Sequence, residues 1–516
     1  MSDGGQVGQA PGGPDGTGVP DPRRWLVLGV IALAQLMIVL DATIMNIALP
    51  SAQTDLHFTI VDRQWVVTAY ALAFGSLLLL GGKLSDLLGR KVTFLAGLIG
   101  FAAASAVGGA ALNFGMLVAA RACQGAFGAL LAPAALSLLA VTFSDPAERG
   151  RAFGVYGAVA GAGGAVGLLL GGVLTEYLSW RWCLYVNLFF AGLAATGAAI
   201  LLPRHPALGR PKMDLPGAAL VSAGMFCIVY GFSNAALHSW HAPSTWGFLT
   251  AGVVLLILFA VRQVRAPQPL LPPRVVTDRN RGAAYLTMLI ASAGMFGIFL
   301  FLTYYLQQTL GFSPVVTGLA FLPMVAGIMT ASITSNIVLM PRFGPRPLAP
   351  SGMILAAGGL ALLTRIGVHS TYAGAVLPSL LMMGLGLGLV FAPVFNTGTF
   401  GVPPQDAGVA AATVNTGQQL GGSIGTSLLN TIFASSVASY IAARSGRGRP
   451  GAQVTGQALI HGYSTVFWWS AAILTGGAIV AVTLFRSGPL TRPGQPQQFQ
   501  PSPDAAPVPD AGRPQA

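Results

Sequence analysis

Residues 82–91 read GKLSDLLGRK, and long apolar stretches lie on both sides of them. Four of these ten residues are charged (Lys83, Asp86, Arg90 and Lys91), whereas charged residues make up 8% of the 516-residue chain. A soluble protein would carry roughly a quarter charged residues, and the mean hydropathy of this chain is +0.68. The composition therefore excludes a soluble globule. It predicts an all-α polytopic membrane protein in which residues 82–91 form a short turn between two spanning helices.

Apolar runs of about 20 residues, the length that crosses a bilayer as a helix, recur along the chain. Fourteen such runs predict fourteen transmembrane helices. They lie near residues 25–49, 64–82, 92–112, 115–141, 152–175, 182–202, 215–235, 246–264, 282–306, 317–340, 348–367, 371–396, 408–436 and 463–486. Two linkers rich in proline and arginine, 203–214 and 265–281, bracket the seventh and eighth runs and leave six runs on either side.

These linkers divide the chain into two six-helix bundles separated by a pair of extra helices. Both chain ends are rich in proline and lack a long apolar run, so we expect disordered tails there. The predicted parts are an N-terminal tail at 1–21, the first bundle at 22–203, a linker with helices 7 and 8 at 204–265, the second bundle at 266–486 and a C-terminal tail at 487–516.

Basic residues are distributed unevenly across the predicted membrane. With the N-terminus inside, cytoplasmic segments hold twenty of the 27 Lys and Arg residues, outer loops hold six, and Arg121 alone lies within a span. The six outer residues are Arg63, Arg181, Arg365, Arg444, Arg447 and Arg449. This bias follows the positive-inside rule and places both termini in the cytoplasm of a cell. The net charge of +12 therefore encodes topology in the cell membrane, and we expect no nucleic-acid partner. Only three of the 27 are Lys, which suggests a GC-rich coding genome, and a bacterial origin is expected.

The sequence carries no motif for ATP use or for metal chemistry. Cys123, Cys183 and Cys227 fall in apolar spans without paired spacing, so we expect neither a disulfide nor a metal site. No G-x-x-x-x-G-K-[ST] motif occurs, which argues against an ATP-driven pump. The sequence also lacks a cluster of acidic residues at a membrane face, which a membrane-embedded enzyme would need. We therefore expect a protein that needs no cofactor.

Glycines recur at helical spacing in the fifth helix of each half. They are Gly157, Gly161, Gly164, Gly167 and Gly171 in the first half, and Gly417, Gly421 and Gly425 in the second. Spacings of three and four place each set on one helical face, and glycine lets membrane helices approach closely. The matched stripes predict close, sliding helix contacts; the alternative is the general abundance of glycine, 68 in this chain. The pair LGRK (88–91) and FGPR (343–346) also indicates an internal repeat.

Several motifs carry a resemblance to a known family. Gly82, Leu84, Asp86, Gly89, Arg90 and Lys91 match a G-x-L-x-D-x-x-G-R-K signature, and further matches are LDATIMNIALP (40–50), RACQGAFGAL (121–130), WRWCLYVN (180–187), LQQTLGFSPVVTGLAFLP (306–323) and NTGQQLGGSIG (415–425). With its fourteen predicted spans the chain resembles the EmrB/QacA-type, fourteen-spanner drug:proton antiporters of the major facilitator superfamily. One departure is Leu168, which stands where Gly-Pro is common, so flexing of that helix would rest on glycine alone.

The resemblance implies the major facilitator fold, two six-helix bundles plus two extra helices. It also implies export of lipophilic or cationic drugs and antibiotics in exchange for protons by alternating access, with the lipid bilayer as surroundings. Export of a lipid, an envelope precursor or an endogenous metabolite, or transport of a non-drug solute, remains the alternative.

Proton coupling requires a group that titrates inside the membrane, and Asp41 is the one acid well within a predicted span. Asp41 lies about 24 Å from the inner end of its span, and Arg121 lies about 9 Å from the outer end of a span that runs the opposite way. Both therefore fall in the outer half of the membrane, and Arg121 is the expected partner of Asp41. Two alternatives stay open: a static ion pair, or a carboxylate that binds a cationic substrate directly.

By the same resemblance, Asp86 and Arg90 help to latch the two halves when the inner gate is closed. Gly82, Gly89 and Lys91 complete this gate loop, with Gly89 where a turn needs a positive φ. The alternative is that the cations of the loop only fix the topology.

Polar residues among apolar neighbours are candidates for the lining of a transport cavity. They are Gln35, Thr43, Asn46, Asn415, Gln418 and Gln419. Such a lining suits bulky lipophilic or amphipathic molecules. Gln35 and Thr43 could equally serve as hydrogen bonders between helices.

Overall fold

The computed structural model describes residues 23–490 apart from 60–61, 144–145, 203–213, 238–239, 241, 268, 368–369, 404–405, 446–450 and 489. Its long helices are α1 (Arg24–Leu56), α2 (Gln64–Leu88), α3 (Arg90–Gly109), α4 (Phe114–Thr142), α5 (Pro146–Tyr177), α6 (Trp182–Leu201), α7 (Leu215–Leu237), α8 (Pro243–Arg265), α10 (Arg279–Tyr304), α11 (Pro314–Thr334), α13 (Pro345–Leu363), α14 (Leu377–Thr399), α15 (Ala407–Ser445) and α16 (Ala452–Leu484). Short helices α9 (Pro273–Val276) and α12 (Met340–Phe343) and the π-helical turns η1 (Tyr305–Thr309), η2 (Ser335–Leu339) and η3 (Tyr372–Val376) complete the elements. The predicted N-terminal tail and nearly all of the C-terminal tail lie outside the described residues.

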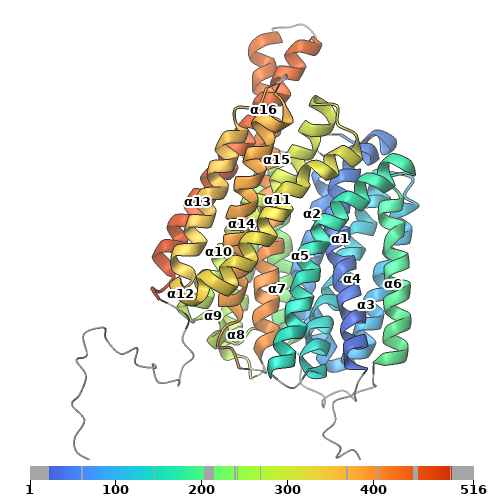
Figure 1. Cartoon of the computed structure of the whole chain (residues 1–516), viewed down its shortest axis with the longest axis vertical. Coiled ribbons are helices and arrows are strands. Elements are labelled where there is room, and N and C mark those ends of the chain that lie inside the picture. Colours follow the sequence, from blue (N-terminus) through green and yellow to red (C-terminus); the bar gives the residue numbers. More distant parts are fainter. Residues whose placement is uncertain are drawn as a thin grey trace, which may run out of the picture.

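All these elements are helical, so the predicted all-α class is confirmed. Among the described residues, thirteen helices are long and apolar enough to cross a membrane. The remaining long helix, α5, has 32 residues and stands among the spanning helices in Figure 1. The count of fourteen spans therefore stays a prediction at α5.

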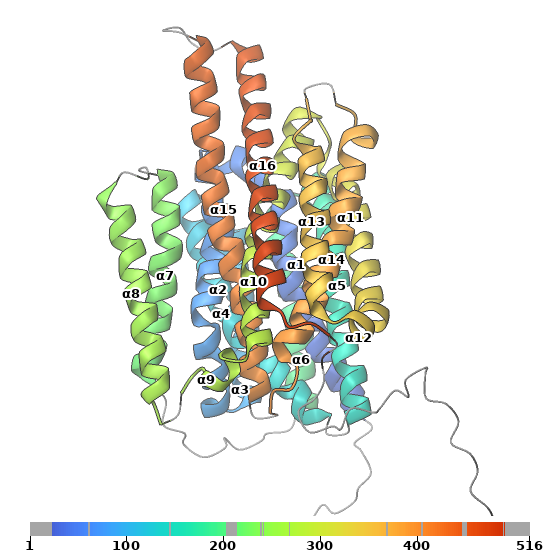
Figure 2. The same cartoon turned by 90° about the vertical axis from the view of Figure 1, so that its left-hand side faces the viewer.

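The long helices form two bundles that stand side by side. In Figure 1, α1–α6 make up one bundle, and α10, α11 and α13–α16 make up the other. The hairpin of α7 and α8 lies at the side of the molecule in Figure 2, and α7 packs against both α2 and α15. The Ser222 hydroxyl of α7 donates a 2.8 Å hydrogen bond to the carbonyl of Ser76 in α2. The extra helices therefore cover the junction of the two bundles.

The same tight turn occurs in both halves of the chain. Gly89 joins α2 to α3 with φ 90°, and Gly344 joins α12 to α13 with φ 71°. A residue with a side chain rarely adopts such φ values. The two short motifs that indicated an internal repeat thus form turns of related geometry.

Glycines bring α15 against α10. A Cβ atom built on Gly421 would overlap the carbonyl oxygen of Leu289, and one on Gly425 would overlap that of Ala293. At Gly417 the nearest atom, the carbonyl oxygen of Tyr285, would lie 3.2 Å away. Backbones this close leave no room for a side chain between them.

The corresponding stripe on α5 meets α1 over only part of its length. A Cβ on Gly167 would overlap the Thr43 hydroxyl, and one on Gly171 would lie 2.9 Å from Ile44. A Cβ on Gly164 would meet nothing within 4 Å, whereas one on its neighbour Gly163 would lie 3.2 Å from Val39 of α1. Gly163 therefore takes the place in the contact that the spacing predicted for Gly164. The surroundings of the other two predicted glycines, Gly157 and Gly161, lie outside the described residues.

Helices α15 and α16 are longer than the sequence predicted. They contain 39 and 33 residues and project beyond the other helices at the top of Figures 1 and 2, whereas the apolar runs predicted spans at 408–436 and 463–486. The projecting turns support each other: the Tyr440 hydroxyl donates to Gln457, and its ring lies 5.1 Å from that of His461. The length of an apolar run predicts only the part of a helix that lies within the bilayer. It does not predict helical turns that continue beyond the membrane.

Helices α1 and α5 of the first bundle make hydrogen bonds to the second bundle at one end, which we call the outer end because the predicted topology places it outside. There Tyr304 donates a 2.5 Å hydrogen bond to Gln53, and Gln307 donates one of 3.2 Å to the carbonyl of Ile47. Glu176 accepts one of 2.9 Å from the amide of Val315. In the described part of the chain, every hydrogen bond from α1 or α5 to the α10–α11 segment lies at this end. The structure therefore describes a conformation closed at the outer end.

Candidate transport site

A fully buried carboxylate stands in the middle of the first bundle. Asp41 of α1 is 0% exposed, and its Oδ2 lies 2.6 Å from Nη1 of Arg121 in α4. Its Oδ1 accepts hydrogen bonds of 2.9 Å from Gln124 and 2.7 Å from Asn187 of α6. The structure thus brings together the two residues that sequence depth alone had placed at a similar level.

Arg121 is satisfied by further partners. Its Nε donates to the carbonyl of Val66 at 3.1 Å, and its Nη1 donates to Oε1 of Gln124 at 2.9 Å. The guanidinium carbon also lies 4.5 Å from the centre of the Tyr70 ring. Gln124 in turn donates to Ser105 of α3 at 2.7 Å. Five helices of the first bundle therefore converge on one polar network, which offsets the cost of burying two charges.

The local sequence of α4 explains this convergence. Arg121 and Gln124 are three residues apart and so share a face of the helix. A Cβ on the next residue, Gly125, would overlap the carbonyl oxygen of Tyr70, so glycine lets α2 approach at the level of the network. The R-x-x-Q-G pattern therefore supplies a cation, its amide partner and the close helix contact that positions both.

Sequence reasoning missed four members of the network: Gln124, Asn187, Ser105 and Tyr70. A signal existed for two of them, because amide side chains inside apolar spans need hydrogen-bond partners. Gln124 and Asn187 both lie in segments that carried the family resemblance. Their proximity to Asp41 depends on how α4 and α6 pack against α1, which the sequence does not state.

The gate loop makes its described contacts within the first bundle. The Lys91 ammonium donates to the carbonyls of Ala199 and Leu202 at the C-terminal end of α6, where a cation is favoured. Arg90 is half-buried at the start of α3, and a Cβ on Gly82 would make only an ordinary 3.7 Å contact. The side chain of Asp86 lies outside the described residues. The predicted latch therefore remains a prediction for a conformation closed at the inner end.

The cavity candidates on α1 make hydrogen bonds within the first bundle. Gln35 accepts a 2.5 Å hydrogen bond from the Tyr156 hydroxyl of α5, so it does connect two helices. Thr43 donates to the carbonyls of its own helix, at 3.0 and 3.1 Å, and Asn46 does so at 3.2 Å.

The candidates on α15 face the junction of the bundles more directly. The side chain of Gln419 lies against Gly75 of α2, where a glycine Cβ would be 3.5 Å away. Asn415 donates to the carbonyl of Ala411 at 3.1 Å, and Gln418 is half-buried. Gln419 is therefore the predicted lining position that the structure places between the bundles.

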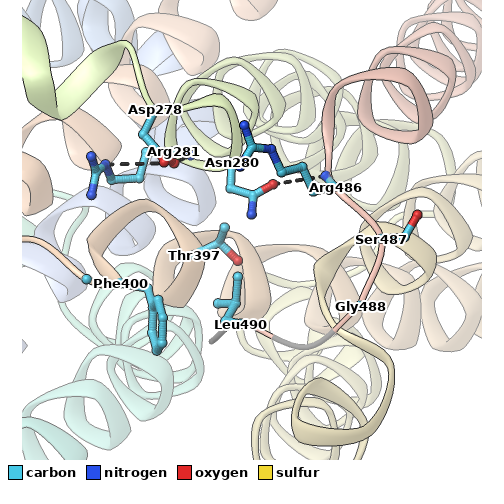
Figure 3. Close-up of a pocket in the computed structure, with 10 residues that line it drawn as sticks. Asp278, Asn280, Arg281, Thr397, Phe400, Arg486, Ser487, Gly488 and Leu490 are labelled. Carbon is cyan, nitrogen blue, oxygen red and sulfur yellow. Dashed lines mark hydrogen bonds and ion pairs between the residues drawn. The ribbon is translucent and has the colours of Figure 1, made fainter. Parts of the chain in front are cut away.

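A separate pocket lies at the inner end of the second bundle and is drawn in Figure 3. It holds about 250 Å³ and is lined by the start of α10, the end of α14 and the segment after α16. Asn280 accepts a hydrogen bond of 2.9 Å from the amide of Arg486 at its edge. None of the predicted site residues lines it, so it is distinct from the Asp41 network.

Arg63 was predicted to lie in an outer loop, and the structure shows that its side chain is buried. Its side chain is 1% exposed, directly before α2. The guanidinium lies among Phe301, Tyr304 and Phe433 of the second bundle. A charge count assigns a residue to a side of the membrane but does not predict which outer residues are covered by the opposite bundle.

Residues 31–426 match the Major Facilitator Superfamily. The chain belongs to this family of membrane transporters. It is 49% identical to the puromycin resistance protein pur8 of Streptomyces alboniger over 91% of this chain and 92% of that protein. It is 38% identical to the cephamycin export protein CmcT of Amycolatopsis lactamdurans over 78% of this chain and 83% of that protein.

The fold comparison agrees with the family. The structure of an auto-inhibited POT family peptide transporter aligns with a TM-score of 0.63 at 16% identity, and covers 92% of this chain and 99% of that one. The predicted superfamily, the major facilitator fold and the transporter class are thereby confirmed, whereas the fourteen-spanner subtype stays a prediction. The chain is a multi-pass membrane protein with bacterial relatives, as expected.

Proposed function

We propose that this protein exports a lipophilic or cationic antibiotic across the cell membrane in exchange for protons, by alternating access. The observation that carries the proposal is the 49% identity, over nearly the whole of both chains, to a puromycin resistance protein. Puromycin, a nucleoside with an amine and an aromatic ether, is an example of the expected substrate class. In this proposal both termini face the cytoplasm and no cofactor is needed.

The network around Asp41 supports proton coupling. The carboxylate accepts hydrogen bonds from Arg121, Gln124 and Asn187, an arrangement that suits its ionised form. A proton on Asp41 would cancel the negative charge that faces Arg121. It would also turn an acceptor oxygen into a donor that faces the donors of Arg121, Gln124 and Asn187. The helices that meet here would then favour a different arrangement, which is the two-state element that coupling requires.

Helix α1 connects this network to the contact between the bundles. It carries Asp41 and, farther along, Ile47 and Gln53, which hold Gln307 and Tyr304 of the second bundle. A shift of α1 that follows protonation of Asp41 would therefore act on the closure of the outer end. In this way the proton site and the contacts that close the outer end lie on one helix.

The test uses the purified chain in liposomes that contain a pH-sensitive dye, with a pH gradient imposed across the membrane. We expect puromycin added to one side to draw protons toward that side as it crosses, and the pH gradient to drive puromycin accumulation in the acidic compartment. A neutral sugar should do neither. If no puromycin and no other lipophilic cation moves under any gradient, the proposal fails.

A further inference from the structure

Arg63 is a buried cation of the first bundle held by aromatic rings of the second. Its guanidinium carbon lies 4.2 Å from the ring centre of Tyr304 and 5.2 Å from that of Phe301, both on α10. It lies 5.1 Å from the ring centre of Phe433 on α15. These distances are those of cation–π contacts. The two bundles therefore meet here through a charge and a set of ring faces.

No carboxylate balances this charge in the described part of the chain. None of the salt bridges between described residues includes Arg63, and its Nε and Nη2 have no hydrogen-bond partner there. A buried cation without a counter-charge is costly. The ring faces are consequently its main compensation, in contrast to Arg121, which has a carboxylate.

The rings form a unit that does not depend on Arg63. The ring centre of Phe433 lies 5.2 Å from that of Phe301 and 5.2 Å from that of Tyr463 on α16. Tyr304 is the last residue of α10 before the π-helical turn η1, and while the outer end is closed it also donates a hydrogen bond to Gln53 of the first bundle. We call Phe301, Tyr304, Phe433 and Tyr463 the aromatic box. Three different helices of the second bundle thus hold the box in place.

The aromatic box belongs to the second bundle and Arg63 to the first, and the two meet where the outer end is closed. Export, the proposed function on which this step rests, requires the outer end to open. Opening withdraws Arg63 with α2 and leaves the ring faces of the second bundle uncovered. Ring faces arranged in this way bind organic cations, quaternary ammonium ions among them.

We propose that the aromatic box is a binding site for an organic cation, filled by Arg63 while the outer end is closed and by a cationic substrate while it is open. Two cations do not fit in the box together, so the return of Arg63 expels the substrate to the outside. Arg63 thereby opposes re-entry of the exported cation.

The first test fills the box with a small cation in place of the arginine. Full-length Arg63→Ala in lipid nanodiscs is melted with methylguanidinium or with methylurea, which has nearly the same shape but no charge. At ten times its Kd, methylguanidinium should raise the melting temperature of the variant by about 3 °C and leave the wild type unchanged. Methylurea should have no effect. Equal effects of the two compounds, or none from methylguanidinium, would overturn the proposal.

The second test uses a bulky cation, tetraphenylphosphonium, in equilibrium binding to the same samples. Arg63→Ala should bind it about tenfold more tightly than the wild type, because the competing cation is gone. The added change Phe433→Leu, which keeps an apolar side chain but removes a ring, should abolish this gain. Arg181→Ala is the control, since Arg181 stacks on Trp180 of its own bundle, 4.7 Å from the ring centre. No gain, or a gain that persists without the Phe433 ring, would overturn the cation site.

If Arg63→Ala fails to fold, tetraphenylphosphonium binding to Phe433→Leu alone tests the cation site. This substitution should weaken tetraphenylphosphonium binding about fivefold, and an unchanged affinity would overturn the proposal. These binding measurements need no gradient and are therefore separate from the export assay. If the protein exports puromycin but fails the binding measurements, the proposed function stands and the cation site is refuted. If it passes the binding measurements but exports nothing, the cation site stands and the proposed function is refuted.

Discussion

Replacement of Asp41 by asparagine is the sharpest test of the buried network. The change keeps the size of the side chain, but it removes the carboxylate that lies 2.6 Å from Arg121. The guanidinium would remain 2% exposed and without a counter-charge. The new amide would also point a donor at a donor wherever its nitrogen faces Arg121 or Gln124. We expect loss of substrate-driven proton movement and a measurable loss of stability.

The size of the stability loss follows from the partners that remain. Removal of one member of a buried ion pair typically costs about 3–5 kcal/mol. Arg121 would keep its hydrogen bonds to Val66 and Gln124 and its contact with the Tyr70 ring, so we expect the lower end, about 3 kcal/mol. Asp41→Asn combined with Arg121→Gln should recover most of this loss, because no unpaired charge is left.

Reversible unfolding in mixed detergent measures the stability of Asp41→Asn, of Arg121→Gln and of the double variant. Internal pH in liposomes measures their coupling. Asp214→Asn is the control for coupling, since Asp214 pairs with Arg262 between α7 and α8, away from the Asp41 network. Unfolding losses that simply add in the double variant would refute the ion-pair argument. Full pH-driven accumulation of substrate by Asp41→Asn would refute coupling through this carboxylate. Loss of binding for cationic substrates only would identify Asp41 as a substrate anchor.

Three further changes test other parts of the structure. Gly421→Ala should destabilise the contact of α15 with α10 by about 1–3 kcal/mol, because its Cβ overlaps the Leu289 carbonyl; Gly164→Ala, with nothing within 4 Å, is the matched control in thermal melting. Asp86→Asn should slow export while the amount of protein in the membrane stays normal, and normal turnover would reduce the gate loop to a topology signal. Burial opposes ionisation of Asp214, but hydrogen bonds from Arg262, the Gly217 amide and Gln263 outweigh it, so its pKa lies below the usual value. The stability that this charge supplies is present at neutral pH and lost in acid, so the difference in melting temperature between wild type and Asp214→Asn should shrink as the pH falls through about 4.

The general architecture of this protein was readable from its sequence because the bilayer imposes a simple rule. A segment that crosses the hydrocarbon must be apolar and must satisfy its own backbone, so the apolar runs predicted the helices directly. The single acid inside a span, Asp41, and the single cation, Arg121, were candidates for the same reason: charges are expensive there. Gly89 was readable as well, because a positive φ restricts the choice of residue.

The sequence by itself determined the number and order of most helices, the family and the two buried charges, all of which depend on local apolarity or on short motifs. Only the tertiary structure decided the partners. Gln124 and Asn187 reach Asp41 from α4 and α6, Gly163 rather than Gly164 faces α1, and Arg63 is buried by rings about 240 to 400 residues farther along the chain. Such contacts depend on the rotation of each helix about its axis and on the relative position of the two bundles. Hydrophobic patterning constrains neither strongly in a membrane, because the lipid-facing side of a helix is as apolar as the side that packs.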